Sequence, residues 1–232
     1  MTINNDNLKN YAIVLASGSG SRFGGNKPKQ FEKISDKTIL ELSLDIFEKN
    51  ANIDEIILVI NPEYKDLAID ITKNKYQKLC AIINGGETRK QSSSIGVNHI
   101  KDFEANVVIH DCARPFLSQE VLNNCIEALK THDAIDVALP VTDTIVFVKE
   151  NFIENIPNRE TLYASQTPQC FKLSLIKKAH ELACNNENFT DDCGIIMKYN
   201  LGKIYIVKGN IENFKITHPS DIELARKIFK NK

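Results

Sequence analysis

The stretch Tyr11-Ala12-Ile13-Val14-Leu15-Ala16-Ser17-Gly18-Ser19-Gly20-Ser21-Arg22-Phe23-Gly24-Gly25-Asn26-Lys27-Pro28-Lys29-Gln30 joins a short apolar run to a loop rich in glycine and serine. A run that is apolar nearly throughout is typical of a strand covered on both faces. Small residues let the following loop wrap closely around a phosphate and direct its N–H groups inward. Arg22 and Lys29 add positive charge for a polyphosphate. The stretch therefore predicts a phosphate-binding loop after the first strand of an open α/β sheet, where ligands of such sheets bind.

Two common phosphate-binding motifs do not fit this loop. The dinucleotide motif G-x-G-x-x-G requires glycine where Phe23 stands, and a P-loop begun at Gly20 reaches Gly25 but then meets Asn26 and Lys27. A flexible turn of small residues is the alternative interpretation. Arg22 together with Pro28-Lys29-Gln30 favours a nucleoside triphosphate.

Short apolar runs alternate with segments of helical spacing along the rest of the chain. Strands are predicted at residues 11–16, 55–60, 81–83, 106–110 and 134–140, and helices at residues 39–49, 62–75, 92–100 and 118–131, with Ser118 as an N-cap. Strands that alternate with helices predict a doubly wound, mostly parallel sheet.

The alternation stops at residues 142–163, where residues 144–149 and 152–156 predict a small hairpin that leaves the main body. Helices are predicted again at residues 173–183, 191–199 and 219–229, with a strand near residues 203–207. No repeat or linker divides the sequence. We expect a single domain over residues 1–232 that carries a protruding β-arm at residues 142–163.

Composition narrows the class of protein. The 232 residues are 42% hydrophobic and 25% charged, and their net charge of −1 offers no overall positive field for nucleic acid. No apolar stretch approaches the roughly 20 residues of a membrane-spanning helix, and the polar start lacks a secretory pattern. The six cysteines show no C-x-x-C spacing, so we expect reduced thiols, no membrane or nucleic-acid partner and a cytoplasmic location.

An ordered series of motifs resembles one family over residues 11–226. After the glycine-rich loop come Gly85-Gly86-Glu87-Thr88-Arg89 with Ser92, His110-Asp111-Cys112-Ala113-Arg114-Pro115, Asp143-Thr144, Arg159, Gln166-Thr167-Pro168-Gln169, Thr190-Asp191 and Asn213-Phe214-Lys215-Ile216-Thr217. This series is similar to the cytidylyltransferases that act on 2-C-methyl-D-erythritol 4-phosphate and on ribitol 5-phosphate. The resemblance implies a Rossmann-like nucleotidyltransferase fold.

The resemblance also implies a reaction and its residues. An acceptor phosphate oxygen would attack the α-phosphorus of CTP and expel pyrophosphate, with Mg²⁺ bridging phosphate oxygens. Catalytic roles are implied for Arg22, Lys29, Lys215 and Asp111, and Asp111 is the expected support for the metal. CTP-binding roles are implied for Ala16, Ser17, Gly18, Ser19, Gly20, Ser21, Gly85, Gly86, Arg89 and Ser92.

The acceptor side is implied to comprise Arg114, Thr144, Arg159, Thr167 and Thr190. In the resembling enzymes the arm reaches a neighbouring subunit, so Thr144 and Arg159 would serve the partner's site in a homodimer. Simpler interpretations remain open: Asp111 caps a turn, Gly85-Gly86 is an ordinary turn, and Ser92 is a helix N-cap. His110 is expected to be a hydrogen-bonded structural residue, because an anionic nucleophile needs little help from a general base.

Some residues differ from the family pattern, and these differences help to predict which acceptor the enzyme uses. Methylerythritol enzymes carry lysine where this chain has Val146, and Ile156-Pro157 with Leu162-Tyr163 around Arg159 is closer to the ribitol branch. Ser17 replaces a smaller residue and Cys112 replaces alanine. The favoured substrates are CTP and an alditol phosphate such as ribitol 5-phosphate, and the alternative acceptor is 2-C-methyl-D-erythritol 4-phosphate. A nucleotide-binding protein without turnover and a sugar-1-phosphate nucleotidyltransferase are the rival classes.

Overall fold

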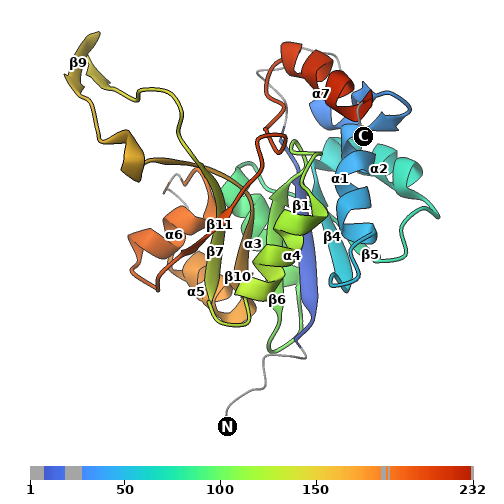
Figure 1. Cartoon of the computed structure of the whole chain (residues 1–232). Helices are drawn as coiled ribbons and strands as arrows, with labels where there is room; N and C mark the ends of the chain where they lie inside the picture. The colour runs from blue at the N-terminus through green and yellow to red at the C-terminus, as the bar shows by residue number, and fades with distance from the viewer. Residues whose placement is uncertain (1–7, 19–27, 184–186, 188, 231–232) are drawn as a thin grey trace.

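A sheet of seven described strands forms the centre of the molecule, in the order β11-β7-β10-β6-β1-β4-β5 (Figure 1). The computed structural model describes residues 8–18, 28–183, 187 and 189–230. The strands are β1 (Asn10–Ala16), β4 (Glu55–Ile60), β5 (Leu79–Asn84), β6 (Asn106–Asp111), β7 (Ala134–Pro140), β10 (Tyr163–Lys172) and β11 (Tyr205–Lys208). All neighbours pair in parallel except β10, which runs antiparallel to β6 and to β7.

Most positions of the central strands β1 and β4 are apolar because both faces of the sheet are covered. Along β1, Ala12 and Val14 join one buried cluster, whereas Ile13 and Leu15 join a second cluster on the opposite face. This alternation follows from the two-residue period of a strand. Residues 11–16 of β1 are therefore apolar at successive positions, and not only at alternate positions.

Helices cover both faces of the sheet, as the doubly wound prediction required. The first buried cluster includes residues of α1 (Ile39–Glu48), α2 (Lys65–Thr72), α4 (Gln119–Ala128) and α7 (Ser220–Lys230). The second cluster includes residues of α3 (Arg89–His99), α5 (Leu173–Leu182) and α6 (Asp192–Lys198). Helix α7 also packs against the small ribbon of β2 (Lys33–Ile34) and β3 (Lys37–Thr38). Three 3₁₀ turns, η2 (Lys29–Phe31), η3 (Pro62–Tyr64) and η4 (Arg159–Thr161), complete the described elements. None of the described helices is long and apolar enough to cross a membrane.

Two predicted helix boundaries were wrong for identifiable reasons. Helix α3 begins at Arg89 and not at Ser92, because Thr88 and Gln91 form a capping box that fixes the start three residues earlier. The interpretation of Ser92 as an N-cap is therefore wrong. The helix predicted at residues 62–75 is a 3₁₀ turn followed by α2, which ends at Thr72 shortly before Asn74 adopts a φ of 59°.

Strand β10 is absent from the sequence-based prediction. Its middle carries Gln166, Thr167, Pro168 and Gln169, which do not form an apolar run. Pro168 cannot donate a ladder hydrogen bond, and the pairing with β7 shifts register between Ser165 and Gln169. The polar residues are buried there because other side chains and backbone groups satisfy them, which a local pattern does not reveal.

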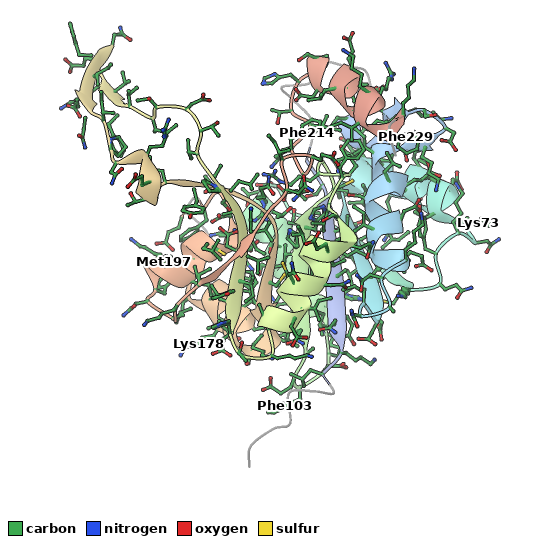
Figure 2. The ribbon with its side chains drawn as sticks, viewed as in Figure 1. Lys73, Phe103, Lys178, Met197, Phe214 and Phe229 are labelled. Atoms are coloured by element: carbon green, nitrogen blue, oxygen red, sulfur yellow. The ribbon has the colours of Figure 1, made fainter. Side chains whose placement is uncertain are left out.

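A hairpin of β8 (Phe147–Lys149) and β9 (Phe152–Asn155) projects away from the sheet, within the predicted arm (Figure 1). Its side chains stand clear of the main body (Figure 2). Phe152 is 76% exposed and Ile153 is 61% exposed. Because a two-stranded ribbon buries little surface by itself, these apolar side chains have no cover within the described chain.

Candidate active site

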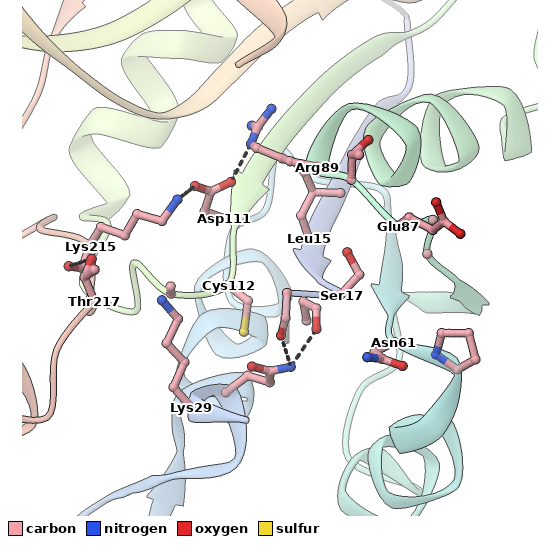
Figure 3. A pocket seen from close by; sticks show the side chains of 18 residues that line it. Leu15, Ser17, Lys29, Asn61, Glu87, Arg89, Asp111, Cys112, Lys215 and Thr217 are labelled. Atoms are coloured by element: carbon pink, nitrogen blue, oxygen red, sulfur yellow. Dashed lines mark hydrogen bonds and ion pairs between the residues drawn. The ribbon is translucent and has the colours of Figure 1, made fainter. Parts of the chain in front are cut away.

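A pocket of about 600 Å³ lies at the carboxyl ends of β1 and β6. The chain passes from β1 to β4 on one side of this pair, and from β6 through α4 to β7 on the other side. The pocket therefore occupies the switch point of the sheet. Its wall is formed by Leu15, Ala16, Ser17, Gly18, Lys29, Gln30, Asn61, Pro62, Gly85, Gly86, Glu87, Thr88, Arg89, Asp111, Cys112, Ala113, Lys215 and Thr217 (Figure 3).

The loop after β1 is fastened to the sheet by Gln30. The Gln30 amide donates to Ala16 O at 2.8 Å and to Gly18 O at 3.3 Å, and the side chain is 4% exposed. The following 3₁₀ turn, η2, places Lys29 on the pocket wall. The predicted phosphate-binding residues Ser19, Gly20, Ser21 and Arg22 lie outside the described residues.

A second wall comes from the turn before α3, where close packing requires glycine. A Cβ atom on Gly85 would lie 2.5 Å from the Cβ of Ser17, and one on Gly86 would lie 2.5 Å from the Cβ of Gln91. The Ser92 hydroxyl accepts from Ser17 Oγ at 2.7 Å and from Gly86 N at 3.1 Å, and donates to Thr88 O at 2.9 Å. Ser92 is fully buried, so its hydroxyl holds the glycine turn in place and does not face the pocket.

Asp111 ends β6 between two positive groups that approach from opposite sides (Figure 3). Lys215 Nζ lies 2.7 Å from Oδ2, and Arg89 Nε lies 3.1 Å from Oδ1. Burial acts to raise the pKa of Asp111, but the charges of Arg89 and Lys215 outweigh burial and hold that pKa well below its usual value. Asp111 is therefore an ionised carboxylate on the pocket wall.

The two lysines reach the pocket from opposite ends of the chain. Lys29 Nζ donates to Ile216 O at 2.6 Å, next to Lys215 in sequence. Ile216 N in turn donates to Ala113 O at 2.9 Å, which ties the C-terminal segment to the residues after β6. The structure thus brings Lys29, Lys215 and Asp111 to one pocket, although 186 positions separate the two lysines.

His110 takes no part in the pocket. Its Nε2 lies 2.9 Å from Arg114 O, so the proton is on Nε2 and Nδ1 accepts from the Thr167 hydroxyl at 3.0 Å. That hydroxyl accepts from Asp111 N at 3.0 Å. Burial lowers the pKa of His110 to about 4, so the ring is neutral and structural, as predicted.

The structure gathers most of the implied nucleotide residues but not the acceptor residues. Arg114, Thr144, Arg159, Thr167 and Thr190 are absent from the pocket wall. Thr167 is buried and forms hydrogen bonds to His110 and Asp111. Arg114 donates to Asn213 O at 2.9 Å. Arg159 sits on the arm and donates to Thr142 O at 2.8 Å. Their acceptor roles stay predictions.

Several residues that organise the site were given no role from sequence. Gln30 anchors the phosphate loop, Thr88 caps α3, and Asp192 forms an ion pair with Arg89 at 2.7 Å. Asn213 is fully buried and donates to Thr167 O at 2.8 Å, which joins β10 to the C-terminal segment. Gln30 and Asn213 belong to the motifs quoted from the sequence, and this was a signal by which they could have been chosen as site residues. Asp192 carried no such pattern.

A metal ion in the pocket would meet the carboxylate of Asp111 on the pocket wall. No group of three or more His, Cys, Asp or Glu residues gathers as a metal site anywhere in the described part of the chain. Magnesium is commonly held by one or two carboxylates, with substrate phosphates and water completing its shell. Asp111 fits that pattern provided that Lys215, now on Oδ2, moves to the phosphates.

A switch-point pocket lined by the start of the loop after β1, two lysines and an ionised aspartate is the arrangement expected of a nucleotidyltransferase on an α/β sheet. The family model of 2-C-methyl-D-erythritol 4-phosphate cytidylyltransferase (IspD) matches residues 11–231. The chain belongs to this family, whose members are CTP-dependent cytidylyltransferases. Its substrates are therefore CTP and a sugar phosphate, and the rival classes without turnover or with a sugar 1-phosphate are set aside.

Individual relatives fall on both acceptor branches. The chain is 39% identical to a bifunctional ribulose 5-phosphate reductase/CDP-ribitol pyrophosphorylase, Bcs1, of Haemophilus influenzae, over 97% of this chain and 49% of that protein, so it spans about half of Bcs1. It is also 39% identical to a 2-C-methyl-D-erythritol 4-phosphate cytidylyltransferase of Thermosipho melanesiensis, over 93% of this chain and 95% of the relative. A crystal structure of 4-diphosphocytidyl-2C-methyl-D-erythritol synthase from Anaerococcus prevotii superimposes with a TM-score of 0.85 at 30% identity, covering 96% of each chain.

Proposed function

We propose that this protein transfers the cytidylyl group of CTP to ribitol 5-phosphate or a similar alditol phosphate, giving a CDP-alditol and pyrophosphate. The observation that carries the reaction is the convergence of Lys29, Lys215 and ionised Asp111 on a pocket that the glycine turn of Gly85 and Gly86 closes. The ribitol branch is supported by Val146 and by the 39% identity to Bcs1 over 97% of the chain.

Each side chain has a physical task in this reaction. The glycine turn permits close approach of the cytosine, and the loop fastened by Gln30 receives the triphosphate. Lys29 and Lys215 flank the reacting phosphate, where they neutralise charge that develops in the transition state. The acceptor phosphate oxygen forms a bond to the α-phosphorus as the bond to the leaving pyrophosphate breaks.

Magnesium is part of the proposal. When bound to the triphosphate, Mg²⁺ would neutralise charge on the phosphates and on the departing pyrophosphate. Asp111 would be its protein ligand, and Lys215 would then bind phosphate oxygens in place of the Asp111 carboxylate. The five cysteines of the described chain are unpaired thiols, which supports function in the reducing cytoplasm.

The proposed assembly is a homodimer with exchanged arms. Apolar side chains of the arm are exposed within one chain, and Thr144 and Arg159 lie on this arm away from the pocket wall. A second subunit would cover the apolar side chains and receive Arg159, whose planar guanidinium is suited to bind a phosphate. The dimer would then hold two composite sites, each formed by the pocket of one chain and the arm of the other. Each chain would remain a single domain of residues 1–232.

A second acceptor is favoured by a separate observation. Relatives that are similar over nearly their whole length are named for 2-C-methyl-D-erythritol 4-phosphate, as in Thermosipho melanesiensis. A pyrophosphate-release assay with CTP and Mg²⁺ should compare ribitol 5-phosphate, methylerythritol 4-phosphate and glycerol 3-phosphate. We expect the highest kcat/KM with ribitol 5-phosphate. A higher value with methylerythritol 4-phosphate would assign the protein to the other branch.

A further inference from the structure

A line of interacting polar and charged side chains runs from the interior to the pocket and ends at Lys215. His180 of α5 and Arg89 of α3 both contact Asp192 at the start of α6, and Arg89 continues to Asp111 at the end of β6. Asp111 in turn holds Lys215 at 2.7 Å. The innermost members, His180 and Asp192, lie outside the pocket wall.

Asp192 is fixed by contacts to both of its carboxylate oxygens and to its backbone. It is fully buried, and its Oδ1 accepts from Ser93 Oγ at 2.6 Å while His180 Nε2 lies 3.3 Å away. Its backbone N–H donates to Gln169 Oε1 at 2.9 Å. Burial acts to raise the pKa of Asp192, but Arg89 and His180 outweigh burial and lower that pKa to about 2. The carboxylate is a fixed negative charge whose Oδ2 is directed to Arg89.

Arg89 divides its guanidinium between two carboxylates. Nη1 lies 2.7 Å from Asp192 Oδ2 and Nε lies 3.1 Å from Asp111 Oδ1, so the shorter contact is the one to the interior. Its Nη2 is buried and has no hydrogen-bond partner in the part of the chain that the structure describes. A guanidinium has a planar fork that can bind one carboxylate with two N–H groups. Without a charge at Asp192, that fork would turn toward both oxygens of Asp111.

We propose that Asp192 is a positioning residue, which keeps Arg89 on a single oxygen of Asp111 and so leaves Oδ2 for Lys215 or for a metal. This inference rests on the proposed function, in which Lys215 and Asp111 act on the reacting phosphates. It gives Arg89 a role different from the CTP contact predicted from sequence. Arg89 is the link between the base-side helix α3 and the catalytic carboxylate.

The direct test is Asp192→Asn, which keeps the shape of the side chain and removes its charge. We expect kcat to fall about tenfold or more, the scale of losing an outer partner of a site. The Kd of CTP, measured by calorimetry, should stay within about threefold, because Asp192 lies outside the pocket wall and its replacement leaves the Arg89 side chain in place. The matched control is Ser93→Ala, which removes the bond to Oδ1 and leaves the Arg89 contact on Oδ2 intact.

A purely structural role predicts a different pattern. In that case Ser93→Ala and Asp192→Asn would lose activity in proportion to their loss of stability, and this result would overturn the proposal. Unchanged kcat in Asp192→Asn would overturn it as well. If Asp192→Asn does not fold, Arg89→Lys serves instead, because one ammonium group cannot bridge both carboxylates as the fork does. It should reproduce the tenfold loss, about 1.4 kcal/mol.

An NMR measurement without substrate tests the positioning role of Asp192 independently of the proposed reaction. Reductive ¹³C-methylation keeps the charge of lysine, and the Lys215 signal can be identified by its loss in Lys215→Arg. The signal should shift in Asp192→Asn and stay in place in Ser93→Ala. If no acceptor supports pyrophosphate release by the wild type, the proposed function is wrong. The shift of the Lys215 signal still tests the positioning role of Asp192 in that case. An unshifted Lys215 signal in Asp192→Asn would overturn it.

Discussion

Ser17 Oγ lies 2.7 Å from Ser92 Oγ, and this pair of hydroxyl groups joins the loop after β1 to the first turn of α3. Ser92 also accepts from Gly86 N, so the pair fixes the backbone that closes one side of the pocket. The phosphate loop and the proposed base-reading turn are therefore one hydrogen-bonded unit.

Ser92→Ala should weaken CTP binding by about 1 kcal/mol, because the half-buried Gly86 N–H and the Ser17 hydroxyl both lose their partner. Ser17→Ala should cost less, since Ser92 keeps its bonds to Gly86 and Thr88. Calorimetric titration with CTP measures both variants. Equal affinity in wild type and Ser92→Ala would show that the turn holds its shape without this hydroxyl.

Lys29→Ala and Lys215→Ala should each lower kcat/KM by about 2 kcal/mol or more, because each removes a positive charge beside the transition state. Steady-state pyrophosphate release with saturating Mg²⁺ gives the measurement. Lys49→Ala is a suitable control, since Lys49 is an exposed lysine outside the pocket. If both pocket variants kept near-native kinetics and unchanged circular dichroism, Lys29 and Lys215 would have no catalytic role.

Folding stability should decrease as the pH falls from 6.5 to 4, partly through His110. Burial lowers the pKa of His110 to about 4, so in this range the unfolded chain binds a proton that the folded chain does not. The difference amounts to about 2 kcal/mol between pH 7.5 and pH 5. Urea denaturation at both values should show a weaker pH dependence in His110→Asn. The exposed His99, changed to Gln, should leave the dependence unaltered.

Arg159→Ala should raise the KM for the acceptor and leave the Kd of CTP nearly unchanged, because Arg159 lies on the arm and not on the pocket wall. Mixing Arg159→Ala with Lys29→Ala should restore activity, since one site of each mixed dimer would combine a wild-type pocket with a wild-type arm. Subunit exchange is followed by mass spectrometry of the mixture. Full activity from a monomer would contradict the exchange, as would exchanged dimers that recover nothing.

Local patterns were sufficient for much of the fold. The bounds of β4 and β7 agree with prediction because those strands are buried on both faces and end at clear breaks. Strand β10 was missed because its buried residues are polar, and Gln169 is acceptable there only because Asp192 N and Asp136 lie beside it. The link from Arg89 to Asp192 could not be predicted from local patterns either, because 103 positions separate the two residues. The fold brings them together by packing α3 and α6 against α5.

Both legs of the arm connect to neighbouring strands of the sheet. Pro140 at the end of β7 pairs with Tyr163 at the start of β10, and Val141 N donates to Leu162 O at 3.0 Å, which closes the base of the arm. Residues between these anchor points pair with no central strand before Tyr163 and are absent from the pocket wall, so substitutions or insertions there should leave the sheet and the pocket intact. Under the acceptor role proposed for Arg159, the arm would be an exchangeable module, through which a family could change one substrate while the nucleotide half of its chemistry is inherited unchanged.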